Sequence, residues 1–182
     1  MWVMLLKNDI TLPGKYISLQ SLKQFKMATP AEGKKAPTFN ALDQNGNKIS
    51  LEQFKGSKVV LYFYPEDDTP TCTEQACNLR DNFGALKKEG MVVLGVSPDA
   101  VEKHKKFEAK FKLPFTLLAD PKHTIIDKYD VWGEKQMFGR KYMGLKRTTF
   151  LIDEKGIIKK VFLKPRSKQH TEEIINAWKE IG

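Results

Sequence analysis

Short apolar runs alternate with amphipathic segments along most of this chain. Residues 59–64 and 91–96 are almost continuously apolar, which is typical of strands buried on both faces of a sheet. Residues 115–119, 148–152 and 158–163 have the length of further strands, and the last two flank a polar turn. The pattern therefore predicts at least five strands beyond residue 58.

Helix-start signals follow three of these runs. The expected helices cover residues 70–90, 97–111 and 120–129, each opening on a Thr-Pro, Ser-Pro or Asp-Pro pair, and a last helix carries an apolar face over residues 174–181. Nearer the N-terminus, Asn45-Gly46 between two short segments predicts a β-hairpin. Leu51 to Phe54 predicts a helical turn after it.

This alternation of strands and helices indicates an α/β fold. The arrangement it favours is thioredoxin-like: a central mixed β-sheet flanked by helices on both faces, with an N-terminal β-hairpin. In such sheets, reactive groups collect at the carboxyl ends of the strands. The segment that follows residues 59–64 is therefore the first place to look for chemistry.

Composition limits the classes of function. The chain has 182 residues, 41% of them hydrophobic, which suits one globular domain, and no apolar run is long enough to cross a membrane. The net charge is +9, but the lysines are spread over the whole length. We therefore expect a solvated basic surface and neither nucleic-acid nor membrane binding.

The first residues differ from the rest. Residues 1–26 are apolar at the start and carry four lysines against one aspartate, which gives only a weak likeness to an organelle transit peptide. We interpret residues 1–34 as an extension, from an upstream start or a leader, and residues 35–182 as the domain. We expect the protein in the cytoplasm, where an isolated cysteine pair is typically catalytic or redox-sensing.

The two cysteines lie at the predicted reactive edge, in Tyr-Pro-Glu-Asp-Asp-Thr-Pro-Thr-Cys72-Thr-Glu-Gln-Ala-Cys77. Either Thr69-Pro70 or a capping box that begins at Thr71 starts the helix, and both place Cys72 in its first turn. Backbone N–H groups and the helix dipole favour a thiolate there. Cys72 is therefore a candidate nucleophile.

The spacing of the cysteines argues against a structural disulfide. Five residues apart on a helix, their Cα atoms are about 8.7 Å apart, whereas a disulfide requires less than about 7 Å. Cys72 and Cys77 could therefore bond only after the helix start unwinds. Buried inert thiols remain an alternative, whereas a zinc site would need further ligands.

At this point the chain resembles a known family. Four segments are similar, in the same order, to motifs of the PrxQ peroxiredoxins, also called bacterioferritin comigratory proteins. They are the string around Cys72, Val131-Trp-Gly-Glu-Lys, Tyr142-Met-Gly and Arg147-Thr-Thr-Phe-Leu-Ile-Asp. They cover nearly all of residues 36–182. Thr71 stands where glycine is frequent in that subfamily, and residues 1–26 have no counterpart there.

The resemblance implies a thiol peroxidase that reduces hydrogen peroxide and organic hydroperoxides without a metal, haem, flavin or other cofactor. Cys72 would attack the peroxide and become a sulfenic acid. Cys77 would then form an intrachain disulfide with Cys72, which thioredoxin would reduce. A monomer is expected, although some members of the subfamily are dimers.

The same resemblance gives roles to other residues. Thr69 would hydrogen-bond the thiolate and the peroxide, Pro65 would exclude water, and the charge of Arg147 would favour the thiolate and polarise the peroxide. Gln75 would orient Arg147, and Arg80 would be a helper at the site or a surface charge. No motif makes a base or ligand of a histidine, His104 included, and the acidic residues 67–68 are expected only as favourable charges at the helix start.

One alternative catalytic cycle and two other classes of function remain open at this stage. Cys77 could be inert in a one-cysteine cycle. The same thiol could serve a peroxide sensor, a redox relay or a holdase. A basic nucleic-acid-binding protein would instead show strong salt-dependent affinity.

Overall fold

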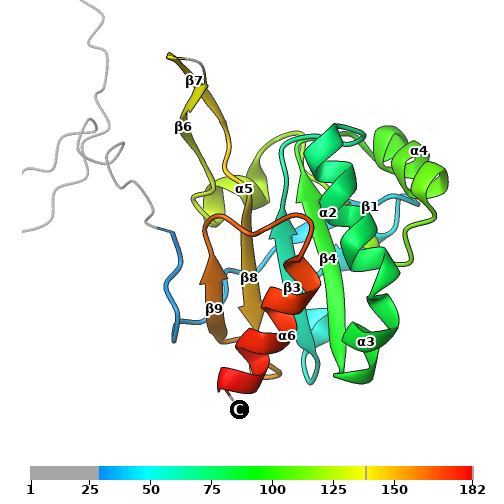
Figure 1. Ribbon diagram of the computed structural model, residues 1–182, viewed down its shortest axis with the longest axis vertical. Coiled ribbons are helices and arrows are strands. Elements are labelled where there is room, and N and C mark those ends of the chain that lie inside the picture. Colours follow the sequence, from blue (N-terminus) through cyan, green and yellow to red (C-terminus); the bar gives the residue numbers. More distant parts are fainter. Residues whose placement is uncertain (1–28, 138, 182) are drawn as a thin grey trace, which may run out of the picture.

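A seven-stranded mixed sheet forms the centre of the molecule in the computed structural model, which describes residues 29–137 and 139–181 (Figure 1). The strand order is β2-β1-β5-β4-β3-β8-β9, in which β3, β4 and β5 run parallel and the other pairs run antiparallel. The strands are β1 (Asn40–Asp43), β2 (Lys48–Ser50), β3 (Lys58–Phe63), β4 (Met91–Ser97), β5 (Thr116–Ala119), β8 (Thr148–Ile152) and β9 (Ile158–Phe162). The predicted fold class and N-terminal hairpin are confirmed.

Helices cover both faces of this sheet, as expected. On one face lie α2 (Pro70–Asp81), α3 (Phe83–Lys88), α4 (Val101–Phe111) and α6 (His170–Ile181); α5 (Thr124–Lys128) and the short η1 (Leu51–Phe54) lie on the other. Figure 1 shows α2, α3 and α6 lying across the front of the sheet. Because β3 and β4 are buried on both sides, they need the continuous apolar sequence that first identified them.

Three helix boundaries differ from the predictions, each because a polar side chain satisfies backbone groups. The first predicted helix divides into α2 and α3 at Asn82, whose side-chain amide donates to the Asn78 carbonyl oxygen at 2.8 Å. Helix α4 begins after residue 100, because the Ser97 hydroxyl bonds the Asp99 backbone N–H. The Asp120 carboxylate accepts from three N–H groups of residues 124–126, so α5 begins there.

An antiparallel hairpin of β6 (Trp132–Met137) and β7 (Arg140–Leu145) was not predicted. It projects beyond the sheet in Figure 1, and its polar strands pair only with each other. Without burial on a sheet face, its sequence lacks the apolar alternation that identifies a strand.

The N-terminal part of the described chain is tied to β9 and to the turn before it. The Gly33 N–H donates to the Ile158 carbonyl oxygen at 2.7 Å, and the Ile158 N–H donates to that of Lys34 at 2.9 Å. Glu32 accepts from the Val161 N–H at 2.9 Å. These bonds attach residues 29–34 to the domain that was expected to begin at Lys35, while residues 1–28 lie outside the described chain. No helix of the described part is long and apolar enough to span a bilayer.

Candidate active site

The connection from β3 to α2 carries the cysteine segment to the carboxyl edge of the parallel strands. Strand β3 ends at Phe63, which pairs with Thr148 at the start of the antiparallel strand β8. Arg147 therefore enters the sheet beside the point where the chain leaves β3 for α2. Sheet register alone brings together two segments that are far apart in sequence.

Cys72 lies in the first turn of α2, and its side chain is almost fully buried, with 3% exposed. Arg147 Nη2 donates to Cys72 Sγ at 3.1 Å. The helix begins at Pro70 with Thr69 as the N-cap, which is the first of the two predicted starts, and the Thr69 side chain makes no capping bond. The guanidinium and the positive end of the helix dipole therefore both lie on the side of the sulfur.

Gln75 fixes the guanidinium. Its Oε1 accepts a hydrogen bond from Arg147 Nη1, and Gln75 itself is fully buried one turn beyond Cys72. Two polar atoms near by, Gln75 Nε2 and the Tyr62 hydroxyl, are buried and have no partner among the described residues. Burial raises the pKa of Tyr62 well above its usual value, and the neighbouring Asp67 and Cys72 raise it further, so the hydroxyl keeps its proton.

The other predicted site residues, Thr69, Pro65 and Arg80, make no hydrogen bond to the Cys72 sulfur in the described part of the chain. Thr69 is half-buried, and its hydroxyl donates to the Glu66 carbonyl oxygen at 3.1 Å, with no bond to Cys72 in the described chain. Pro65 is half-buried directly after β3. Of the two roles expected for Arg80, its contacts favour the surface charge, because its guanidinium binds Asp81 and the Phe111 carbonyl oxygen, each at 2.8 Å.

Cys77 lies on the same helix and is half-buried. Both cysteines are free thiols, and α2 is continuous across them. The regular helix between them keeps their Cα atoms about 8.7 Å apart, beyond disulfide reach. Arg80 lies close to Cys77. Hydrogen bonding to Asp81 raises the pKa of Arg80, and the negative charge of a Cys77 thiolate raises it further.

A groove of about 770 Å³ opens beside the buried thiol. At the site end it is lined by Thr71, Arg147 and Thr148. Farther out, the lining combines apolar and basic side chains: Trp132, Leu163, Pro165, Lys135, Lys146 and Lys164. Leu163 is 64% exposed, so an apolar surface is available to a ligand that enters the groove.

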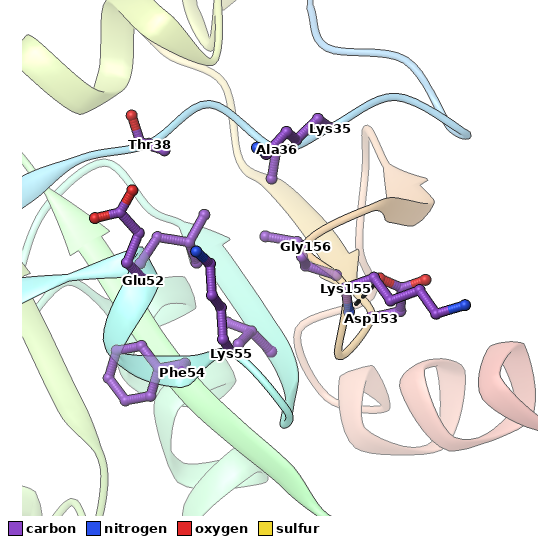
Figure 2. Close-up of a pocket in the computed structure, with 12 residues that line it drawn as sticks. Lys35, Ala36, Thr38, Glu52, Phe54, Lys55, Asp153, Lys155 and Gly156 are labelled. Atoms are coloured by element: carbon purple, nitrogen blue, oxygen red, sulfur yellow. Dashed lines mark hydrogen bonds between the residues drawn. The ribbon is translucent and has the colours of Figure 1, made fainter.

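A second cavity lies at the opposite end of the sheet and contains none of these groups. Figure 2 shows it between η1 and the turn that joins β8 to β9, with Glu52, Lys55 and Asp153 at its rim. The cavity measures only about 40 Å³. Because Val59, at the start of β3, lines it, whereas Cys72 follows the end of β3, this cavity is separate from the Cys72 thiol.

One buried pair near the site was missed by sequence reasoning. Asp67, expected only as a favourable charge at the helix start, is buried and lies 2.7 Å from His104 Nδ1 through its Oδ2. Both side chains are fully enclosed. The two residues are 37 positions apart in a loop and a helix, so no local pattern could have paired them. No group of three or more potential metal ligands occurs within residues 29–137 and 139–181.

Comparison with known proteins places this chain in a family. The AhpC/TSA family model matches residues 32–161. Peroxiredoxin Bcp of Escherichia coli is 46% identical over 145 residues, covering 80% of this chain and 93% of that protein, and Peroxiredoxin Bcp of Bacillus subtilis is 43% identical over 150 residues, covering 82% and 96%.

Solved structures agree with these relatives. A cysteine-to-serine mutant of Xylella fastidiosa PrxQ superposes with a TM-score of 0.78 at 27% identity, covering 84% of this chain and 98% of that one. A bacterioferritin comigratory protein of Xanthomonas campestris, described by its alkyl peroxide reduction activity, gives a TM-score of 0.73 at 30% identity, with 78% and 90% covered. With a reactive-edge cysteine, a second cysteine on the same helix and relatives that span the whole domain, the chain belongs to the AhpC/TSA family, among its PrxQ/Bcp peroxiredoxins.

Proposed function

We propose that this protein is a thiol peroxidase that reduces hydrogen peroxide and organic hydroperoxides, with Cys72 as the nucleophile. The observation that carries the proposal is the 3.1 Å contact from Arg147 Nη2 to the buried Cys72 Sγ in the first turn of α2. A permanent cation and helix N–H groups stabilise the anionic sulfur and the oxyanion that is released when the O–O bond breaks.

In the first step the Cys72 thiolate attacks one peroxide oxygen and the O–O bond breaks. The sulfur becomes a sulfenic acid, and the other oxygen takes a proton and leaves as water or alcohol. Arg147 remains beside the charge on the Cys72 sulfur and the charge on the leaving oxygen, and Gln75 holds the guanidinium there. By turning away from the Glu66 carbonyl, the Thr69 hydroxyl would become a second hydrogen-bond donor to the peroxide, beside Arg147, and Pro65 would help to keep water out.

In the second step the Cys77 sulfur attacks the Cys72 sulfenic sulfur. The S–O bond breaks, hydroxide leaves with a proton as water, and an intrachain disulfide forms. The start of α2 must unwind first, because the helix holds the two residues too far apart. A dithiol protein such as thioredoxin then returns both cysteines to thiols by exchange.

The groove beside Arg147 supports organic hydroperoxides as substrates. An alkyl group on the peroxide would lie along Leu163 and Trp132 while its O–O bond reaches Cys72. We further propose a cytoplasmic monomer. The support for this is the low cysteine content, two cysteines in 182 residues, which suits a reducing compartment, and the resemblance to a mostly monomeric subfamily.

Replacing Cys77 tests the cycle. Cys77→Ser is expected to abolish turnover with thioredoxin, thioredoxin reductase and NADPH, while one equivalent of peroxide is still consumed per protein. Intact mass should then show one added oxygen in the variant but a loss of two hydrogens in the wild type. Continued turnover of Cys77→Ser would instead support the one-cysteine cycle. A Cys72 that reacts with peroxide no faster than free cysteine would contradict the peroxidase itself.

A further inference from the structure

The loop that leads into the reactive helix, residues 64–69, is held by α4 through three consecutive acidic residues. Glu66 binds Lys103 at 2.7 Å, Asp67 binds His104 at 2.7 Å, and Asp68 binds Lys110 at 2.6 Å. The outer two pairs are exposed, with 40% to 58% of each side chain accessible, whereas the middle pair is fully buried. Exposed pairs contribute little, so the Asp67–His104 pair dominates the attachment.

The surroundings of this pair show that it is a complete hydrogen-bond network. His104 Nε2 donates to the Leu118 carbonyl oxygen at 3.1 Å, and the Tyr64 hydroxyl donates to Asp67 Oδ1 at 2.6 Å. Because a carbonyl only accepts, Nε2 carries a proton, and a second proton must lie between Nδ1 and Asp67 Oδ2. The pair is thus neutral overall and satisfies each of its buried polar atoms.

The backbone of the loop is fixed at the same place. The Asp67 N–H donates to Asp99 Oδ2 at 2.7 Å, at the entry to α4. The next residue, Asp68, has a φ of 61°, the left-handed conformation that turns the chain into α2 and that side chains other than glycine adopt at a cost. Bonds on both sides of that turn hold it in place.

The loop in turn sets the position of the reactive thiol. Thr69, the last residue of the loop, is the N-cap of α2, and its carbonyl accepts the Thr73 N–H at 2.8 Å. The Tyr64 and Tyr62 rings stack with centroids 5.3 Å apart, in the same buried cluster as Cys72. A shift of the loop would therefore move the first turn of α2 relative to Arg147, which is anchored beside β8.

We propose that His104, acting through Asp67, is a positioning residue that holds the start of α2 where Cys72 meets Arg147. It touches no reacting atom. This inference rests on the proposed peroxidase function.

Two substitutions at His104 separate positioning from core filling. The side-chain nitrogen of Asn can replace Nδ1 and keep the bond to Asp67, whereas that of Gln can replace Nε2 and keep only the bond to Leu118. We expect His104→Asn to react with peroxide within about threefold of wild type. His104→Gln leaves the buried Asp67 carboxylate without its partner, so we expect its second-order rate constant to fall about tenfold or more.

Two further variants complete the test. Asp67→Asn can donate to a neutral His104 and still accept from Tyr64, so it should also remain within about threefold. Lys106→Met, which removes an exposed charge from the same helix outside the three pairs, is the matched control and should remain within about twofold. Rates are measured by stopped flow, with circular dichroism confirming that each variant folds.

Equal losses in His104→Asn and His104→Gln, or no loss in His104→Gln, would overturn the proposal. Should His104→Gln fail to fold, Asp99→Ala releases the same loop from the partly exposed side and should lose about tenfold; an unchanged rate would count against positioning. Wild-type protein that reduces no peroxide would instead refute the proposed function, which the wild-type measurement tests first.

Discussion

Replacing Arg147 with methionine removes the cation beside the reactive sulfur and retains much of the side-chain volume. Two unit charges 3.1 Å apart interact by about 5 kcal/mol at the effective dielectric constant of a protein surface and by about 1 kcal/mol in water. Because Arg147 is half-buried beside a buried sulfur, its contribution lies between these limits. We take about 3 kcal/mol, which corresponds to roughly a hundredfold in rate.

The rate constant for wild-type and variant proteins with hydrogen peroxide is measured by stopped flow under single-turnover conditions. Ultraviolet absorbance of the thiolate reports the fraction of Cys72 that is ionised and so separates loss of the nucleophile from loss of peroxide polarisation. Arg140→Met is the matched control, because Arg140 is an exposed residue of β7 and its loss changes net charge equally. Gln75→Leu should give an intermediate loss, since it frees the guanidinium without removing it.

Loss of about a hundredfold in Arg147→Met, with Arg140→Met within about twofold, would support the electrostatic role. If Arg147→Met reacts within about threefold of wild type, the contact to Cys72 contributes nothing to the chemistry. A similar loss in both variants would mean that net charge, and not the 3.1 Å contact, governs the rate.

Two further predictions concern the groove and a buried histidine. Leu163→Asp should lower kcat/KM for cumene hydroperoxide about fivefold and leave that for hydrogen peroxide unchanged, because in the proposed binding mode only the organic substrate would cover this side chain of the groove. Burial lowers the pKa of His170 to about 4, and urea unfolding at several pH values should show the result. Between about pH 6.5 and 4 only the unfolded chain binds this proton, so stability falls as the pH falls, by about 3 kcal/mol over that window.

Each of these predictions has a variant that can contradict it. Met143, 60% exposed and outside the groove lining, is the control for Leu163, and an equal effect of Met143→Asp on cumene hydroperoxide would exclude the groove. His170→Gln should flatten the pH dependence between about 6.5 and 4. If the slope of this variant equals that of the wild type, His170 is not the group that takes up the proton.

Buried strands and the start of the reactive helix could be predicted because their causes are local. Strands β3 and β4 are enclosed on both faces, so almost every side chain must be apolar. Proline is favourable at the first position of α2 because a backbone N–H at that position would have no partner within the helix, so its absence loses no hydrogen bond. The same reasoning placed Cys72 in the first turn without any knowledge of the fold.

The parts that could not be predicted depend on contacts between distant segments. Arg147 reaches Cys72 because Phe63 pairs with Thr148, and nothing in residues 140–150 alone reveals that register; its assignment came from the family resemblance. The Asp67–His104 pair was missed for the same reason. Asp120 was taken as a helix start, yet its carboxylate caps N–H groups four to six residues onward.

The reactive helix is held firmly before its first residue and weakly at its first turn. Before Pro70, the loop is fixed to α4 by a buried pair and by the Asp67 backbone bond. At the start of α2, the Thr69 side chain makes no capping bond and no acidic residue lies in the first turn; the missing cap costs a helix about 1 kcal/mol. The same uncapped N–H groups are free to face the sulfur of Cys72. In the proposed cycle, unwinding would therefore begin at Pro70 and proceed toward Cys77 while the loop remains on α4, so that one uncapped turn would support both the attack on peroxide and the closing of the disulfide.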